Sequence, residues 1–183
     1  MAIETPICDF GKKAPDFKLK STDNKILSLN DIKGENGTLV MFICNHCPYV
    51  KAVTKEIVED CSELQNIGIN SVAICANDAE NYPEDSFENM IKFAKDNKFS
   101  FPYLTDETQE IAKSYGAVCT PDFFGYNKNL ELQYRGRIRE LKDLKPVNKN
   151  DSDLLKAMRM VAKTGKGPEN QVPSMGCNIK WSK

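Results

Sequence analysis

The sequence predicts an α/β fold in which helices flank both faces of a central mixed β-sheet. A continuous apolar run, "TLVMFI" at 38–43, is typical of a strand that is buried on both faces. After Pro48 the apolar residues change to helical spacing, and strands and helices then alternate along the rest of the chain. This alternation is the pattern of a layered α/β architecture.

The segments around the buried strand predict a hairpin before it and a long helix after it. "FKLK" at 17–20 and "KILSL" at 25–29 predict two short strands joined by a turn at Asp23-Asn24, which together form an N-terminal β-hairpin extension. The helix that follows the buried strand ends at Gly68. Its apolar stripe consists of Val50, Val53, Ile57, Cys61, Leu64 and Ile67.

Further elements follow from the same patterns. Asp85 and Glu88 are spaced as a capping box that opens a helix over 85–96. The remaining expected elements are strands at 69–75 and 102–104, a helix at 107–115 closed by Gly116, a hairpin of 122–126 with 130–136, and a helix at 153–165 capped by Asp151 or Ser152. From about residue 166 to 183 we expect an irregular tail.

Length and composition predict one soluble domain over residues 1–183. The net charge is −1 and the acidic and basic residues are mixed along the chain, so the sequence predicts no basic face that would bind nucleic acid. No apolar run approaches the roughly 20 residues of a membrane span. The seven cysteines are odd in number and spread along the chain, unlike a secreted disulfide scaffold. Because the first residues hold no apolar signal core, we expect a cytoplasmic protein, in which a close cysteine pair is catalytic or metal-binding.

The stretch "FICNHCPYV" contains such a pair, Cys44 and Cys47, with His46 between them and Pro48 directly after. Proline is best tolerated at the first position of a helix, which makes Cys47 the N-cap. Its sulfur would then lie at the positive end of the helix dipole, where thiolate is favoured over thiol. Local physics therefore predicts Cys47 as the attacking thiol and Cys44 as its disulfide partner.

Three other interpretations of the stretch stay open. In the usual C-x-x-C register Cys44 attacks, although Pro48 would then fall inside the helix and remove a backbone hydrogen bond. His46 is either a cationic neighbour that lowers the thiol pKa or a loop residue facing solvent. Cys44, His46 and Cys47 are also metal ligands by type, with Cys119 or Cys177 to complete a set, but three ligands within four residues is tight spacing. We therefore expect neither a metal nor a cofactor.

Several longer motifs are similar to one family. "GKKAPDFKL" resembles the opening of AhpC/TSA and TlpA-like thioredoxin-fold proteins, and "LVMFICNHCP" resembles their active-site segment. "YGAVCTPDFFGYNKNLELQYRG" resembles their proline-containing strand and hairpin, and "NHCPYV" with the ending "GCNIKW" resembles a peroxiredoxin-like subgroup. The resemblance covers nearly the whole chain and implies a thioredoxin-like fold.

The resemblance also implies roles for single residues. It places Cys47 on the nucleophilic cysteine, puts His46 at the usual tryptophan and leaves Val50 at the usual second cysteine, so the resolving thiol is Cys44, Cys119 or Cys177. Thr120-Pro121 corresponds to a cis-proline bond that packs against the active-site cysteines and binds substrate. Arg137 falls at a position that rims the site. We expect Cys119 to be a buried thiol with a structural role.

The function expected from these residues is thiol–disulfide oxidoreduction. The Cys47 thiolate would attack a disulfide of a protein or small molecule, Cys44 would resolve the mixed disulfide, and an external thiol would reduce the pair again. One alternative is a peroxiredoxin-like thiol peroxidase, but two residues typical of peroxiredoxins are missing here. Peroxiredoxins carry a threonine three residues and a proline seven residues before the reactive cysteine, where this chain has Cys44 and Val40. The other alternative is a protein that binds metal or senses redox state without turnover.

Overall fold

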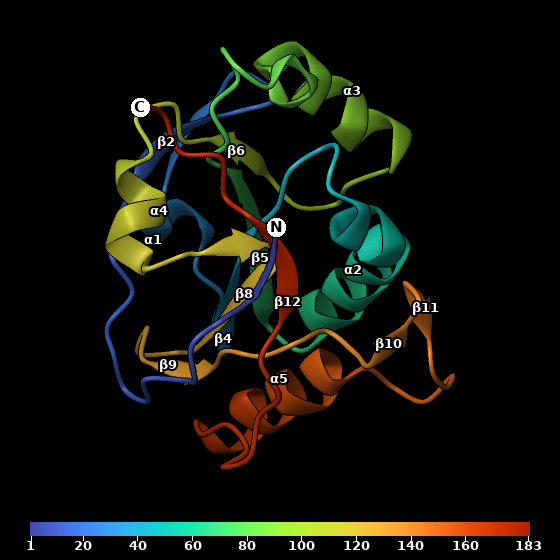
Figure 1. The fold of residues 1–183 in the computed structure, drawn as a ribbon. Helices are drawn as coiled ribbons and strands as arrows, with labels where there is room; N and C mark the ends of the chain where they lie inside the picture. Colours follow the sequence, from blue (N-terminus) through green and yellow to red (C-terminus); the bar gives the residue numbers. More distant parts are fainter.

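The computed structural model describes residues 1–183 and is built around a seven-stranded mixed sheet (Figure 1). Its strand order is β3-β2-β6-β5-β4-β8-β9, and β4 is parallel to β5 and antiparallel to β8. The strands are β2 (Lys18–Ser21), β3 (Ile26–Ser28), β4 (Gly37–Phe42), β5 (Ile69–Cys75), β6 (Tyr103–Thr105), β8 (Asp122–Asn127) and β9 (Leu132–Tyr134).

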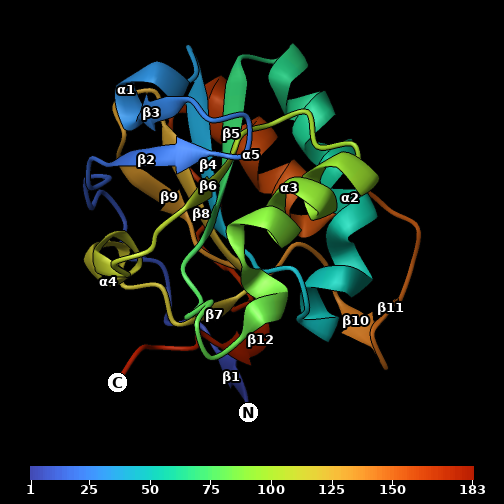
Figure 2. The ribbon, with the colours of Figure 1, turned by 90° about the horizontal axis from the view of Figure 1, so that it is seen from above.

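Helices cover both faces of the sheet (Figures 1 and 2). They are α1 (Leu29–Ile32), α2 (Pro48–Asn66), α3 (Phe87–Asp96), α4 (Glu110–Tyr115) and α5 (Asp153–Thr164). Because side chains alternate along a strand, β4 contributes to two cores. Leu39 and Met41 pack in the core that faces α2, α3 and α5, whereas Val40 and Phe42 pack in the core that faces α1 and α4. The central strand is therefore buried on both faces, as its continuous apolar run predicts.

Most of the expected elements are confirmed. The N-terminal hairpin forms β2 and β3 at one edge of the sheet, and the hairpin of 122–126 with 130–136 forms β8 and β9 at the other edge. Helix α2 begins at Pro48, and the Ser152 side chain caps α5 by accepting a hydrogen bond from Leu155 N. The structure contains no helix that is both long and apolar enough to cross a membrane.

The capping box expected for α3 is wrong. Ser86 is the N-cap, and its hydroxyl accepts a hydrogen bond from Asn89 N. Asp85 instead belongs to a short 3-10 turn, Pro83–Asp85, and its buried carboxylate accepts a hydrogen bond from Asn45 N at 2.8 Å. The cap moves by one residue because this tertiary contact takes the Asp85 side chain away from the helix.

The segment after residue 166, expected to be irregular, contains a strand. Strand β12 (Met175–Asn178) lies between β1 (Ala2–Glu4) and β7 (Cys119–Thr120) in a separate antiparallel sheet. Gly176 permits the close approach, since a Cβ there would lie 2.1 Å from Thr120 O. The four residues of β12 carry no strand pattern of their own, because their pairing depends on segments far away in the sequence. A second unexpected pair, β10 (Leu141–Lys142) with β11 (Lys145–Pro146), precedes α5.

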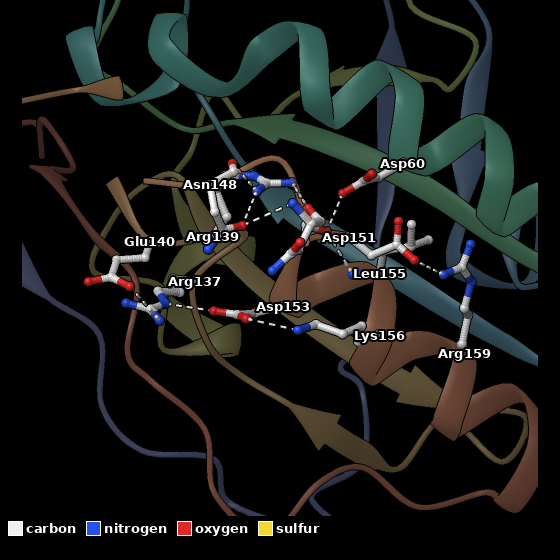
Figure 3. A network of polar contacts seen from close by, with 12 residues as sticks. Asp60, Arg137, Arg139, Glu140, Asn148, Asp151, Asp153, Leu155, Lys156 and Arg159 are labelled. Atoms are coloured by element: carbon white, nitrogen blue, oxygen red, sulfur yellow. Dashed lines mark hydrogen bonds and ion pairs between the residues drawn. The ribbon is translucent and has the colours of Figure 1, made fainter. Parts of the chain in front are cut away.

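Polar contacts fasten α5 and the preceding loop to α2. Arg139 lies 2.7 Å from Glu56 of α2, and the Ser152 hydroxyl donates to Asp60 at 2.6 Å. Figure 3 shows this network, with Asp60 directed at the first turn of α5. Asp60 is buried, and burial raises the pKa of its carboxyl to about 6. A raised carboxyl pKa in the folded state means that folding favours the protonated form.

We expect the folded state to lose stability as the pH rises through about 6, since Asp60 then ionises in its buried position. This contribution is fully present below the ordinary carboxyl pKa of about 3.9. Asp60→Asn keeps an acceptor for Ser152 and removes the charge. It should raise the free energy of unfolding near neutral pH by about 1–2 kcal/mol and leave it nearly unchanged at about pH 4. Urea unfolding at both pH values measures this, with the exposed Glu59→Gln as the control.

Candidate functional site

The two cysteines of "FICNHCPYV" meet at the start of α2. Cys47 is the N-cap residue and Pro48 occupies the first turn, as the sequence predicts. Both cysteines are 1% exposed. Thr120 touches both sulfurs: its carbonyl oxygen lies 3.3 Å from Cys47 Sγ, and its hydroxyl lies 3.4 Å from Cys44 Sγ. The loop after β4, the start of α2 and β7 therefore converge on one enclosed pair of thiols.

The surroundings of the two sulfurs separate their acidities. The Cys44 thiol donates a hydrogen bond to Cys47, and this contact lowers the pKa of Cys47 most, against the opposing effect of burial. Cys47 Sγ makes no side-chain cap hydrogen bond at the start of α2. The Val50 N–H in the first turn nevertheless lowers the pKa of Cys47 further. The same shared hydrogen bond, together with burial, raises the pKa of Cys44. These effects favour the thiolate at Cys47 and the thiol at Cys44.

Cys177 is the third thiol at this site. Its S–H and its backbone N–H both act on Cys47 as hydrogen-bond donors. Burial raises the pKa of Cys177 to about 11, and its hydrogen bond to Cys47 adds to the increase. The sequence analysis places Cys177 only among the candidate resolvers; β12 brings it to Cys47.

Asp85 is a site residue that sequence reasoning missed. Besides Asn45 N it accepts a hydrogen bond from Asn77 Nδ2 at 2.8 Å, and its Oδ2 lies 2.7 Å from His46 Nδ1. The negative charge of this buried carboxylate also helps to raise the pKa of Cys44. The available signal was Ser86, which is itself an N-cap residue and leaves Asp85 free for another role.

His46 faces Asp85 and Cys44. Its ring stacks over Tyr82, with centroids 6.2 Å apart and planes 6° from parallel. One ligand atom each from Cys44, His46 and Asp85 lie within 4.8 Å of one another, a spacing that suits a single ion. The fold thus brings the carboxylate of Asp85, which is distant in sequence, to the neighbouring ligands Cys44 and His46.

The structure brings some of the other expected site residues together and leaves one apart. The Thr120-Pro121 bond is cis, as the family resemblance implies. Cys119 is buried and donates to Pro121 O, and burial raises the pKa of this thiol, consistent with a structural role. Arg137 pairs with Asp153 at 2.7 Å (Figure 3) and lines a cavity of about 210 Å³ beside Pro121. Its guanidinium is thus held by α5 and rims the region without a contact to a sulfur.

A buried ion pair lies directly behind the proline. Arg135 reaches Asp122 at 2.9 Å, and its guanidinium also lies over the Phe124 ring and donates to Gly116 O. Burial raises the pKa of Asp122, while the hydrogen bond and charge of Arg135 oppose that increase. This pair anchors the segment that carries Thr120, and nothing in the local sequence pattern indicates it.

Residues 10–141 match the AhpC/TSA family. The chain belongs to the AhpC/TSA family. Over its full length it is similar to an uncharacterized conserved protein from Geobacillus kaustophilus, with 42% identity, coverage of 100% of this chain and 97% of the other, and a TM-score of 0.94. A hypothetical protein from Sinorhizobium meliloti is 36% identical, with coverage of 98% and 97% and a TM-score of 0.89.

More distant similarities connect this AhpC/TSA protein to redox proteins. It is 26% identical to the thiol-disulfide oxidoreductase ResA of Bacillus thuringiensis over 66% of this chain, and the match spans 65% of that relative. The thioredoxin domain of a thiol-disulfide oxidoreductase from Bacteroides vulgatus is 18% identical, with coverage of 69% and 86% and a TM-score of 0.58. The fold is accordingly thioredoxin-like, as the sequence motifs imply.

We expect the pKa of Cys47 to depend on the hydrogen bond from Cys44. Cys44→Ala removes the donor and should raise the pKa of Cys47 by about one to two pH units, since a hydrogen bond to a charged group contributes about 1.5–3 kcal/mol. Cys44→Ser keeps a hydrogen-bond donor, so the pKa of Cys47 should stay close to its value in the native protein. The ultraviolet absorbance of the thiolate, followed against pH, measures both, and Cys47→Ser should abolish the acidic transition. Equal midpoints in the alanine and serine variants would contradict this assignment.

Proposed function

We propose that this protein is a thiol–disulfide oxidoreductase that uses Cys44 and Cys47 as its redox pair. The observation that carries the proposal is the convergence of both buried sulfurs on Thr120 at the start of α2, where Cys47 Sγ lies 3.3 Å from its carbonyl oxygen and Cys44 Sγ lies 3.4 Å from its hydroxyl. A disulfide requires neighbouring sulfurs, and a fast exchange requires one of them as thiolate. The shared contact with Thr120 and the lowered pKa of Cys47 support both requirements for this pair. We propose a disulfide-containing protein or small molecule as substrate, and a cytoplasmic thiol as reductant.

The reaction uses the different acidities of the two thiols. In reduction of a substrate disulfide, the Cys47 thiolate displaces one substrate sulfur, which leaves as a thiolate and takes up a proton. Cys44 then gives up its proton and attacks Cys47 Sγ. The second substrate sulfur leaves, and the Cys44–Cys47 disulfide remains. Two electrons and the Cys44 proton pass from the protein to the substrate, and solvent supplies the second proton.

Two features support this reaction over peroxide reduction. Cys44 and Val40 stand where a peroxiredoxin would carry threonine and proline. The only hydroxyl in contact with either sulfur among the described contacts is that of Thr120, which lies against Cys44 rather than Cys47. The protein should therefore consume hydrogen peroxide, with a thiol reductant supplied, far more slowly than it reduces disulfides.

A second candidate function, metal binding, is favoured by the cluster of Cys44, His46 and Asp85. Its sulfur, nitrogen and oxygen ligands fit Zn²⁺, which takes four such ligands in tetrahedral sites. A zinc ion would hold Cys44 as a thiolate and exclude the disulfide. The two candidate functions are therefore mutually exclusive states of the same thiols.

The redox function predicts different results for the two cysteine variants in an insulin reduction assay with a thiol reductant. The native protein should accelerate insulin reduction. Cys47→Ser should reduce the rate to the uncatalysed background, because it removes the thiolate. Cys44→Ser should stop turnover but leave a mixed disulfide at Cys47 that mass analysis detects. Cys75→Ser, a change at a buried thiol of β5, is the matched control and should retain activity. Full activity in Cys47→Ser would refute the proposal.

Metal binding predicts that protein purified anaerobically contains about one equivalent of zinc, measured by elemental analysis. Asp85→Asn should lower this content and His46→Ala should lower it further, whereas Glu84→Gln, next to the cluster in the same turn, should not. A metal-free protein that forms the Cys44–Cys47 disulfide would exclude this candidate and leave the redox function in place.

A further inference from the structure

The thiolate assigned to attack disulfides is not at the surface. Cys44 and Cys47 are each 1% exposed, and the cavity beside Pro121 is lined by neither sulfur. A substrate disulfide needs direct, nearly linear access to the attacking sulfur. The enclosed pair therefore needs a path by which the disulfide reaches solvent.

Strand β12 lies over this position and carries a cysteine there. Cys177 is paired with Thr120 across the antiparallel β12–β7 ladder, and Thr120 is the residue whose oxygens touch both enclosed sulfurs. Cys177 is half-buried, with one side on the core that contains Cys44 and Cys47 and the other toward solvent. The strand pairing therefore places Cys177 beside the residue that contacts Cys47. Of the three thiols, Cys177 is the one that faces both the pair and the surface.

We propose that Cys177 is a third redox cysteine, which exchanges with Cys47 and so carries the disulfide between the enclosed Cys44–Cys47 pair and thiols in solution. This inference rests on the proposed redox function and adds a surface residue to it. It also gives β12 a role in the chemistry, beyond pairing with β1 and β7.

The relay is balanced when a thiol reductant regenerates the enzyme. Cys177 attacks Cys47 Sγ: the Cys47–Cys177 bond forms, the Cys44–Cys47 bond breaks, and the Cys177 proton passes to Cys44. An external thiol then attacks the accessible Cys177 sulfur, Cys47 leaves as a thiolate, and one proton is released. A second external thiol displaces the first from Cys177 and supplies its proton. One protein disulfide and two external thiols thus become one protein dithiol and one external disulfide.

The exposure of the two sulfurs suits attack from solvent. In the Cys47–Cys177 disulfide the half-buried Cys177 sulfur is the accessible one, and the enclosed Cys47 sulfur is the leaving group.

The test has two measurements on the full-length protein. In Cys44→Ser, mild oxidation should trap a Cys47–Cys177 disulfide, identified by mass mapping after alkylation. In the protein with Cys44 intact, the Cys44–Cys47 disulfide should be reduced by glutathione at least about tenfold more slowly after Cys177→Ser. Cys8→Ser changes another half-buried cysteine outside the site and should keep the native rate. Circular dichroism spectra of all variants control for folding.

The outcomes separate this inference from the proposed function. If the Cys44–Cys47 disulfide forms and glutathione reduces it at the same rate in Cys177→Ser, the relay is overturned and the redox pair stands. Failure to trap Cys47–Cys177 in Cys44→Ser overturns the relay as well. A dominant Cys47–Cys177 bond in the native protein, without any Cys44–Cys47 bond, would overturn the proposed pair and establish Cys177 as the resolving cysteine.

Discussion

The site depends on the position of Thr120 between the two enclosed sulfurs. The register of β8 on β4 pairs Asp122 with Phe42, so the chain that enters β8 must pass the loop that follows β4. This places the Thr120 carbonyl against Cys47 and its hydroxyl against Cys44. On its other side Thr120 pairs with Cys177. One residue therefore connects the central sheet, the start of α2 and the C-terminal strand.

Electrostatics then assign different roles to two thiols that are three residues apart. Cys47 lies at the positive end of α2, and hydrogen bonding from Cys44 lowers its pKa, which favours a thiolate. Cys44 lies near the buried carboxylate of Asp85, whose negative charge disfavours a second anion. The proton consequently stays on Cys44 and is donated to Cys47. His46, paired with Asp85, belongs to the carboxylate side of this arrangement rather than to the first turn of α2.

Enclosure of the pair is the second constraint on its chemistry. Burial penalises a thiolate, and hydrogen bonding from Cys44, Val50 and Cys177 opposes this penalty at Cys47. The same enclosure limits contact with large substrates, which makes the half-buried Cys177 important in the proposed relay. The anchors around the pair, the Asp122–Arg135 ion pair behind Pro121 and the α2–α5 contacts of Figure 3, hold these elements in register.

The sequence by itself determined the α/β class, the buried central strand and the start of α2 at Pro48, with Cys47 as its N-cap. These follow from apolar periodicity and from proline at a helix start, which act within a few residues. The tertiary structure alone decided the positions of Asp85 and Cys177 and the strand at Met175–Asn178. Asp85 pairs with an amide 40 residues earlier, and β12 pairs with both β1 and β7. Such contacts depend on where distant segments meet, and local spacing contains no information about that.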